Sequence, residues 1–205
     1  HNTRMNRRNL DIQDKILLAA LEDVPFEGWS WPLVQQAALR IGYEPEMADA
    51  VFIEKLPGIL DHFSDWADRQ MLAALADIDG DAMRVRDRIQ RAVQIRLGFL
   101  EPHREAVRAS LGYWARPLRK YRAAKNIWKT ADHIWHWAGD RSTDYNHYTK
   151  RILLSGILTS TMLVWLNDQS HANGDTDMFL TRQIENVLKL GQFTGTINRV
   201  IKKDA

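Results

Sequence analysis

The chain has 205 residues, of which 45% are apolar and 26% charged, a composition that excludes a disordered protein. Its formal net charge of +2 is too small to indicate nucleic-acid binding by itself, and the absence of cysteine excludes disulfides, cysteine-ligated zinc and thiol nucleophiles. No apolar run is long enough to span a bilayer, and the polar N-terminus does not have the pattern of a signal peptide. Residues 1–4 precede Met5 and are interpreted as additions in front of the natural start.

Apolar residues recur at helical spacing along almost the whole chain, and no alternating strand pattern of useful length is present. The sequence therefore predicts an all-α protein. Three short helices are expected within residues 10–58, which is the size of a helix-turn-helix head. They run from Ile12 to Leu21 with an end at Pro25 and Gly28, from Pro32 to Arg40 with Ser30 as N-cap, and onward from about Pro45.

The remaining residues, 59–205, are predicted to form a larger helical body. Eight tryptophans in the chain indicate a large aromatic core or a pocket. The expected helices are Ile59–Ala76, Ala82–Leu100, His103–Trp114, Leu118–Gly139, Thr143–Asn167 and Thr176–Leu190.

The charge pattern of the head argues against DNA binding. A recognition helix needs cations, because neutralisation of phosphates supplies most of the non-specific affinity. From Gly42 to Asp65 the chain has six acidic residues and only Lys55, a net charge of −5. From Arg84 to Lys125, in the body, it has 12 basic and 3 acidic residues. This basic stretch is either a solvated face or a surface for acidic lipids or a protein partner, and the head is interpreted as vestigial.

Residues 135–151, with the sequence WHWAGDRSTDYNHYTKR, form the most specific motif. The motif resembles the signature AGD-x-STD-[FY]-N-x-Y-T-[KR]-R of the lipid-binding accessory proteins of ubiquinone (coenzyme Q) biosynthesis, the ninth of the numbered Coq set. A second stretch, LEDVPFEGWSW at residues 21–31, resembles that family's L-x-x-V-P-F-x-G-W-S-x. The resemblance extends from Leu10 to about Gln192.

This resemblance implies a TetR-regulator-type fold, with a vestigial helix-turn-helix head and a larger ligand-binding body. It also implies a homodimer without enzymatic activity, which holds a lipid or isoprenoid quinone in an apolar cavity. The protein would present quinone precursors to the di-iron demethoxyubiquinone hydroxylase. Its expected location is the bacterial cytoplasm, peripherally at the inner membrane, or the matrix side of that membrane in mitochondria. The helices His103–Trp114 and Thr143–Asn167 are candidates for the dimer interface.

The residues themselves favour an apolar pocket. Trp128 and Trp135 lie seven residues apart on one helix face, and apolar residues surround the next helix on nearly all sides. A tryptophan-rich core without a cavity is the alternative. The resemblance places Arg151 beside the lipid head group. The predicted lipid-binding residues are Trp114, Trp128, Trp135, Arg151, Ile152, Leu158 and Met162.

Aromatic residues flanked by cations follow the STD motif and are typical of a protein-docking patch. In the family, the positions of His147 and Tyr148 face the hydroxylase, although His147 replaces the tryptophan often found in eukaryotic members. Ser142, Thr143 and Asp144 could instead only cap the following helix. The predicted partner-binding residues are Asp144, Tyr145, His147, Tyr148 and Lys150.

Enzymatic alternatives have little support in the sequence. Asp132, His133, His136, Asp140 and His147 are the only plausible metal ligands, and they lack the repeated Glu-x-x-His pattern of di-iron bundles. The chain has no GxSxG, P-loop, GxGxxG or HExxH motif, so no catalytic residue, metal or cofactor is expected. The alternative from another functional class is a ligand-sensing TetR-type transcriptional repressor.

The C-terminal residues predict a weak membrane contact. Eukaryotic family members end in a separate amphipathic helix, whereas residues 196–203 here form barely two turns after Gly191 and Gly195. This indicates either a shortened chain or a family member that ends early. Weak, salt-sensitive binding to anionic membranes is expected from this basic tail and from the face between Arg84 and Lys125.

Overall fold

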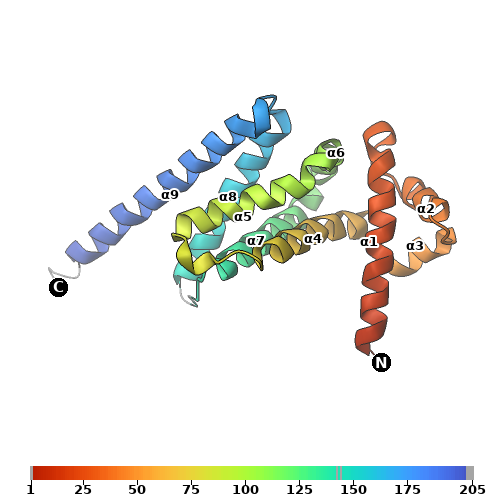
Figure 1. Ribbon diagram of the computed structural model, residues 1–205, viewed down its shortest axis with the longest axis horizontal. Helices are drawn as coiled ribbons and strands as arrows, with labels where there is room; N and C mark the ends of the chain where they lie inside the picture. The colour runs from red at the N-terminus through yellow and green to blue at the C-terminus, as the bar shows by residue number, and fades with distance from the viewer. Residues whose placement is uncertain (1, 142, 144, 202–205) are drawn as a thin grey trace. The chain divides into compact units, whose positions relative to one another are not determined.

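A computed structural model describes the backbone of residues 2–141, 143 and 145–201, and the side chains of these residues apart from 2–5, 145 and 190–201. This part of the chain is α-helical with short 3-10 turns and contains no strand, which confirms the all-α prediction (Figure 1). The helices are α1 (Asn2–Glu27), α2 (Trp31–Arg40), α3 (Pro45–Val51), α4 (Leu56–Leu75), α5 (Val85–Leu100), α6 (Arg104–Trp114), α7 (Lys120–Trp137), α8 (Tyr145–Asn167) and α9 (Gly174–Ile201).

The chain divides into two compact units, which differ from the predicted head of residues 10–58 and body of residues 59–205. The head unit contains His1–Ala73 and Gly98–Asn126, and the body unit contains Ala74–Leu97 and Ile127–Ala205. The α6 helix belongs to the head unit because α1 packs against it and the indole nitrogen of Trp29 donates a hydrogen bond to the Ala106 carbonyl, at 3.0 Å. The two packing units therefore do not follow the boundary predicted after residue 58.

The first three helices form a helix-turn-helix arrangement, with α2 and α3 beside α1 (Figure 1). Ser30 is the N-cap of α2 as predicted, and its hydroxyl accepts a 3.3 Å hydrogen bond from the Leu33 amide. Helix α1 does not end before Pro25, because a proline in the last turn removes only one backbone hydrogen bond. The helix ends where Gly28 adopts a left-handed φ of 74°.

A buried polar cluster joins α1 to α4 inside the head unit. One carboxylate oxygen of Asp14 lies 2.7 Å from Nε2 of His62, and Arg69 donates two hydrogen bonds to the same carboxylate, at 2.6 and 2.8 Å. Burial lowers the pKa of His62, because desolvation penalises the charged imidazolium and Arg69 adds to this, against the pull of Asp14. The ring of the buried Phe52 lies 5.6 Å from the His62 ring, edge-on.

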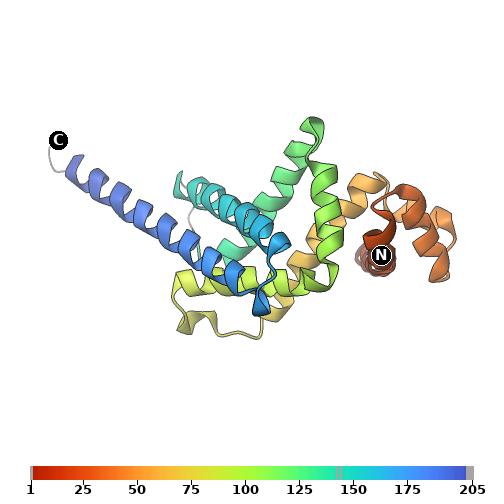
Figure 2. The same ribbon diagram turned by 90° about the horizontal axis from the view of Figure 1, so that it is seen from above.

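In the body unit, α8 packs against α9 (Figure 2). The side chain of Asp168 closes the turn between them. Asp168 accepts hydrogen bonds from the amide and hydroxyl of Ser170 and from the amide and hydroxyl of Thr176, at 2.5 to 2.8 Å. Helix α9 continues to Ile201, so the predicted end at Leu190 is wrong. Glycine inside a helix costs only about 1 kcal/mol relative to alanine and need not end it.

Among the residues that the structure describes, no helix combines the length and the apolar character that crossing a bilayer requires.

Candidate functional site

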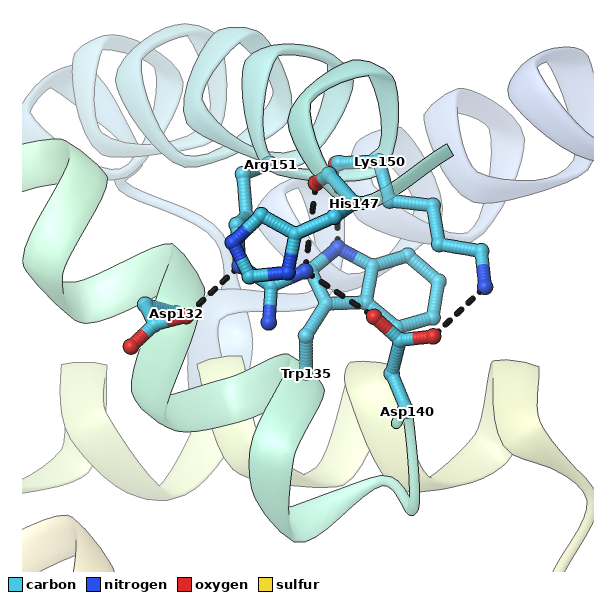
Figure 3. Close-up of polar contacts among 6 residues, drawn as sticks. All are labelled: Asp132, Trp135, Asp140, His147, Lys150 and Arg151. Carbon is cyan, nitrogen blue, oxygen red and sulfur yellow. Dashed lines mark hydrogen bonds and ion pairs between the residues drawn. The ribbon is translucent and has the colours of Figure 1, made fainter. Parts of the chain in front are cut away.

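Arg151 is the centre of the polar corner between the end of α7 and the start of α8 (Figure 3). Its side chain is only 3% exposed, although it is the last residue of a motif that is otherwise rich in polar side chains. The guanidinium donates from Nε to Asp132 at 2.6 Å, and from Nη1 to Asp140 at 2.9 Å and to the His147 carbonyl at 3.1 Å. One side chain therefore connects α7, the turn that follows it and the first turn of α8.

Lys150 and Trp135 complete this corner. The Lys150 ammonium lies 2.6 Å from the second carboxylate oxygen of Asp140, whose side chain is 4% exposed. The same ammonium lies 5.5 Å from the centre of the Trp135 ring, within the range of a cation–π contact. The Trp135 indole nitrogen donates a 2.9 Å hydrogen bond to the Lys150 carbonyl. Asp132, Trp135, Asp140, Lys150 and Arg151 define the corner. Each of them has a polar contact with at least one of the others (Figure 3).

The backbone after α7 explains the AGD part of the motif. Ala138 is buried, and its carbonyl accepts a 3.2 Å hydrogen bond from Arg88 on α5. Gly139 has a φ of 91°, a left-handed conformation that favours glycine, and it lies next to the same guanidinium. This turn directs Asp140 back toward α8, where it meets Lys150 and Arg151. The motif therefore fixes the end of α7 against the start of α8.

The charges of the corner balance, with two carboxylates and two cations. Burial opposes the charge of Arg151, but the hydrogen bonds that its guanidinium donates to Asp140 and Asp132 raise its pKa above the ordinary value. Arg151 and Asp140 are the two buried members, and removal of either leaves an uncompensated buried charge, which is strongly unfavourable. The corner is therefore a rigid, neutral frame rather than an open anion-binding site.

The predicted role of Arg151 as a ligand of a lipid head group stays a prediction, and these contacts show what a lipid phosphate would have to displace. The guanidinium is buried and bound to carboxylates of its own chain, which occupy the positions that a phosphate would take. Ile152 differs from its predicted place in an enclosed cavity, because its side chain is 62% exposed. One residue along a helix rotates the side chain by about 100°, so a buried Arg151 turns Ile152 outward.

The other predicted lipid-binding residues lie in both units. Trp128 and Trp135 on α7 and Leu158 and Met162 on α8 belong to the body unit, and all four are buried or half-buried. Trp114 belongs to the head unit, where its ring lies edge-on to Tyr113 at 5.0 Å. One pocket of about 570 Å³ in the head unit is lined by none of these residues. Its lining includes Asn6, Arg7, Leu10, Gln13, Val51 and Ile53.

Only some of the predicted partner-binding residues are free to contact another protein. Tyr148 is 58% exposed, and its ring lies 6.2 Å from Trp128 and 5.2 Å from the half-buried His147. Lys150 is instead engaged by Asp140. Asp144 lies outside the described residues, as does the side chain of Tyr145, so the structure does not place these two predicted contacts.

Sequence reasoning missed the function of two residues that it had weighed as metal ligands. Asp132 and Asp140 are the partners of Arg151, and no group of three or more metal-ligating side chains occurs within the described ranges. The sequence did contain one indication of ion pairing, because acidic and basic residues are equal in number between residues 132 and 151. Pairing them requires the turn at Gly139, which sequence spacing alone does not define.

Comparison with solved structures defines the fold class. The structure is similar to a TetR transcriptional regulator from Nitrosomonas europaea, with a TM-score of 0.68 over 85% of this chain and 97% of that one. The two sequences are 20% identical, so the similarity concerns the fold alone. The chain thus has a TetR-regulator-type fold, as predicted.

Comparison with protein sequences then identifies similar proteins. Residues 121–191, which contain the α7–α8 corner, match the COQ9 family model. The chain is 32% identical to the mitochondrial ubiquinone biosynthesis protein COQ9 of Rattus norvegicus and 30% identical to that of Homo sapiens, over 88% of its own length in both cases. It spans about three fifths of the length of these curated relatives, 60% and 58%. The chain is thus similar to COQ9 proteins over most of its length and matches the COQ9 family over residues 121–191.

Proposed function

We propose that this chain is a lipid-binding accessory protein of ubiquinone biosynthesis. In this proposal it holds an isoprenoid or other lipid and presents quinone precursors to the demethoxyubiquinone hydroxylase. The observation that carries the proposal is the similarity to COQ9 proteins over 88% of the chain, which includes the corner formed by the signature motif. The names of these relatives assign them to ubiquinone biosynthesis.

The interior of the body unit supports the lipid part of the proposal. Helix α8 buries Leu154, Leu158 and Trp165, and the half-buried Trp128 and Trp135 lie on α7. Apolar and aromatic walls with few polar groups are typical of sites for hydrophobic ligands. The experiment is mass spectrometry of lipids extracted from the purified protein. Co-purified isoprenoid quinones or phospholipids would support the proposal, and a protein without lipid would overturn it.

Thr161 offers a sharper test of the same proposal. Its hydroxyl is fully buried on α8 and has no hydrogen-bond partner within the described part of the chain. Buried hydroxyls are normally paired, and a carbonyl or ether oxygen of a bound lipid would supply the partner. Thr161→Val should therefore reduce the quinone retained by the protein. Ser160→Ala, which removes a half-buried hydroxyl on the same helix that is bonded to the Gly156 carbonyl, is the matched control.

The homodimer in this proposal forms through α8. Ile152, Gly156, Thr159 and Leu163 fall on one face of this helix, and all four are exposed. The outer face of α6, the other predicted candidate, carries charged side chains such as Arg108. Symmetric contact between two copies would bury the apolar stripe on α8.

Sedimentation velocity of Leu163→Arg tests the dimer. The variant should sediment as a monomer, whereas Leu39→Arg, which places the same charge on an exposed position of α2, should remain a dimer. A monomeric unchanged protein would contradict the proposed assembly.

We propose neither catalysis nor DNA binding for this chain. Helix α3, at the position of a recognition helix, contains Glu46 and Asp49 and no basic residue. Asp49 also accepts hydrogen bonds from Trp31 and Gln35 within the head. A gel-shift assay at low salt is the test, because even weak non-specific binding appears there. Nanomolar affinity for an operator-like sequence would instead support a ligand-sensing repressor.

The proposed location is peripheral, at the inner membrane of a bacterium or on the matrix side of the mitochondrial one. The names of the relatives describe mitochondrial proteins, and an anionic inner membrane would attract basic surfaces of this chain. The predicted tail at residues 196–203 lies where side chains are not described. Co-sedimentation with anionic vesicles at low and high salt tests the contact.

A further inference from the structure

The turn between α6 and α7 in the head unit presents two large apolar side chains to solvent. Leu118, in the 3-10 turn Pro117–Arg119, is 100% exposed, and Tyr121, in the first turn of α7, is 82% exposed. The two helices converge on this turn at the top of Figure 2. Burial of such side chains would be favourable, yet the turn leaves both in water.

Contacts between Arg119 and Tyr113 fix the shape of the turn. The Arg119 guanidinium lies 3.7 Å from the centre of the Tyr113 ring and donates a 3.4 Å hydrogen bond to the Tyr113 carbonyl. Tyr113 in turn lies edge-on to the buried Trp114. The exposure of Leu118 therefore belongs to a turn with defined internal contacts.

Cations surround the two apolar side chains, and the chain has no acidic residue from Ala106 to Ala131. Arg122 pairs with Glu54 and Asp61 from the neighbouring part of the head unit. Arg116, Lys120 and Lys125 are exposed, and none has an ion pair within the described ranges. Tyr121 and Lys125 are four residues apart on α7 and share one face.

We propose that this turn, the apolar tip formed by Leu118 and Tyr121 with the cations Arg116, Lys120 and Lys125, inserts into an anionic membrane surface. The inference rests on the membrane location proposed above and assigns the contact to particular residues. Leu118 and Tyr121 enter the interfacial region, where an aromatic ring with a hydroxyl is favoured, while the cations meet lipid phosphates.

The chemistry of the tip favours a bilayer over a protein or nucleic-acid partner. Two apolar side chains bury far less area than a stable protein interface needs. A nucleic acid would bind the cations through its phosphates, but it would leave the fully exposed Leu118 side chain in water. A lipid interface uses both, because apolar insertion and attraction by anionic head groups add to one another.

A single fluorescent label tests the insertion directly. Because the chain has no cysteine, Leu118→Cys provides one labelling site for an environment-sensitive fluorophore. On vesicles of phosphatidylcholine and phosphatidylglycerol, the emission should shift to shorter wavelength, and it should not shift with phosphatidylcholine alone. Phe26→Cys is the matched control, since Phe26 is 88% exposed in the same unit but adjoins Glu27, and its label should stay in water.

Unlabelled variants separate the apolar from the electrostatic contribution in vesicle flotation. The double variant Leu118→Ser, Tyr121→Ser should bind anionic vesicles about tenfold more weakly, because it removes the apolar insertion. Neutralising Arg116, Lys120 and Lys125 to glutamine should weaken binding by about fivefold per cation and lower its salt dependence. Neutralising the exposed Arg182 and Lys189 on α9 is the control for net charge.

The outcomes distinguish this inference from the proposed function. Flotation with an unshifted label at position 118 would overturn insertion of the tip and leave a membrane contact elsewhere on the chain. Loss of binding in the charge variant alone, with the Leu118 and Tyr121 double variant unaffected, would show a simple polyanion site and also overturn it. Lipid carriage is measured independently, by extraction of the purified protein, and does not depend on either result.

Discussion

Nε of Arg151 lies 2.6 Å from a carboxylate oxygen of Asp132, so an ion pair joins α8 to α7 across a separation of 19 residues. The same guanidinium binds Asp140, which is almost as inaccessible to solvent as Arg151 itself. The most recognisable motif of the chain therefore has a structural role, in addition to any contact that its exposed residues make.

Arg151→Ala should lower the free energy of unfolding by about 3 kcal/mol, because it removes the partner of a buried carboxylate. Arg151→Lys should recover only part of this loss, since an ammonium cannot reproduce the guanidinium contacts with both Asp132 and Asp140. Urea denaturation measures both, with Arg91→Ala as the exposed control on α5. If Arg151→Ala unfolds like the unchanged protein but loses bound phospholipid, the head-group role predicted from the sequence is supported.

Gly139→Ala should destabilise the protein by about 1 kcal/mol or more. The φ of 91° at this position is strained for any residue with a Cβ, and the added methyl group would lie 3.4 Å from the Arg88 guanidinium. Gly112→Ala is the matched control, since this glycine lies within α6 with open space around it and alanine should stabilise the helix slightly. Thermal unfolding of the two variants should therefore shift in opposite directions.

The stability of the protein should fall as the pH decreases from neutrality, in part through His62. Its pKa in the unfolded chain is near the ordinary value of 6.5, and burial lowers it in the folded protein. Between these two values the unfolded state binds more protons, so folding stability is present above pH 6.5 and is lost as the pH falls toward the lower folded pKa.

His62→Gln keeps a hydrogen-bond donor near Asp14 and removes the titration. Melting temperatures across the acidic range should therefore change less with pH in this variant than in the unchanged protein. The pKa of His103 is also lowered by burial, so some pH dependence remains in the variant. His171→Gln, at an exposed position, is the control and should leave the slope unaltered. An unchanged slope in His62→Gln would contradict the assignment.

Asp168→Ala should destabilise the junction of α8 and α9 by about 1–2 kcal/mol, through loss of a helix cap and unpaired donors. The hydrogen bonds from Ser170 and Thr176 outweigh the effect of burial and hold the pKa of Asp168 far below its ordinary 3.8. The carboxylate therefore stabilises the fold above pH 3.8, and this contribution is lost only as the pH falls below that value. Urea denaturation at neutral pH tests the variant, with Asp175→Ala at an exposed position as control.

Tyr148→Ala should weaken binding of the demethoxyubiquinone hydroxylase by about 2 kcal/mol while changing the melting temperature little. An exposed aromatic anchor contributes mainly to affinity, and its packing against Trp128 is a peripheral contact. Titration calorimetry with the purified hydroxylase measures the affinity, and Phe26→Ala is the control at a similarly exposed position. Equal losses of stability and binding would instead place Tyr148 in the core.

Periodicity and local backbone chemistry were sufficient to predict most of the architecture. The helical spacing of apolar residues determines the all-α class, and Ser30 before Pro32 determines where α2 begins, because caps and first-turn prolines act within a few residues. The signature motif likewise indicates the similarity to COQ9 proteins from residue identities alone. Each of these signals is local, which is why it can be read before folding is considered.

The tertiary structure decided what the residues of that motif do. Arg151 and Ile152 are adjacent in sequence, yet the Arg151 side chain is buried and bound to two carboxylates, whereas the Ile152 side chain faces outward. Their difference depends on the left-handed turn at Gly139, which directs Asp140 onto α8. It also depends on the rotation of α8 that buries the guanidinium. Ion pairs across a turn form only when two helices have a particular spacing and rotation, and no spacing of residues along the chain contains that information.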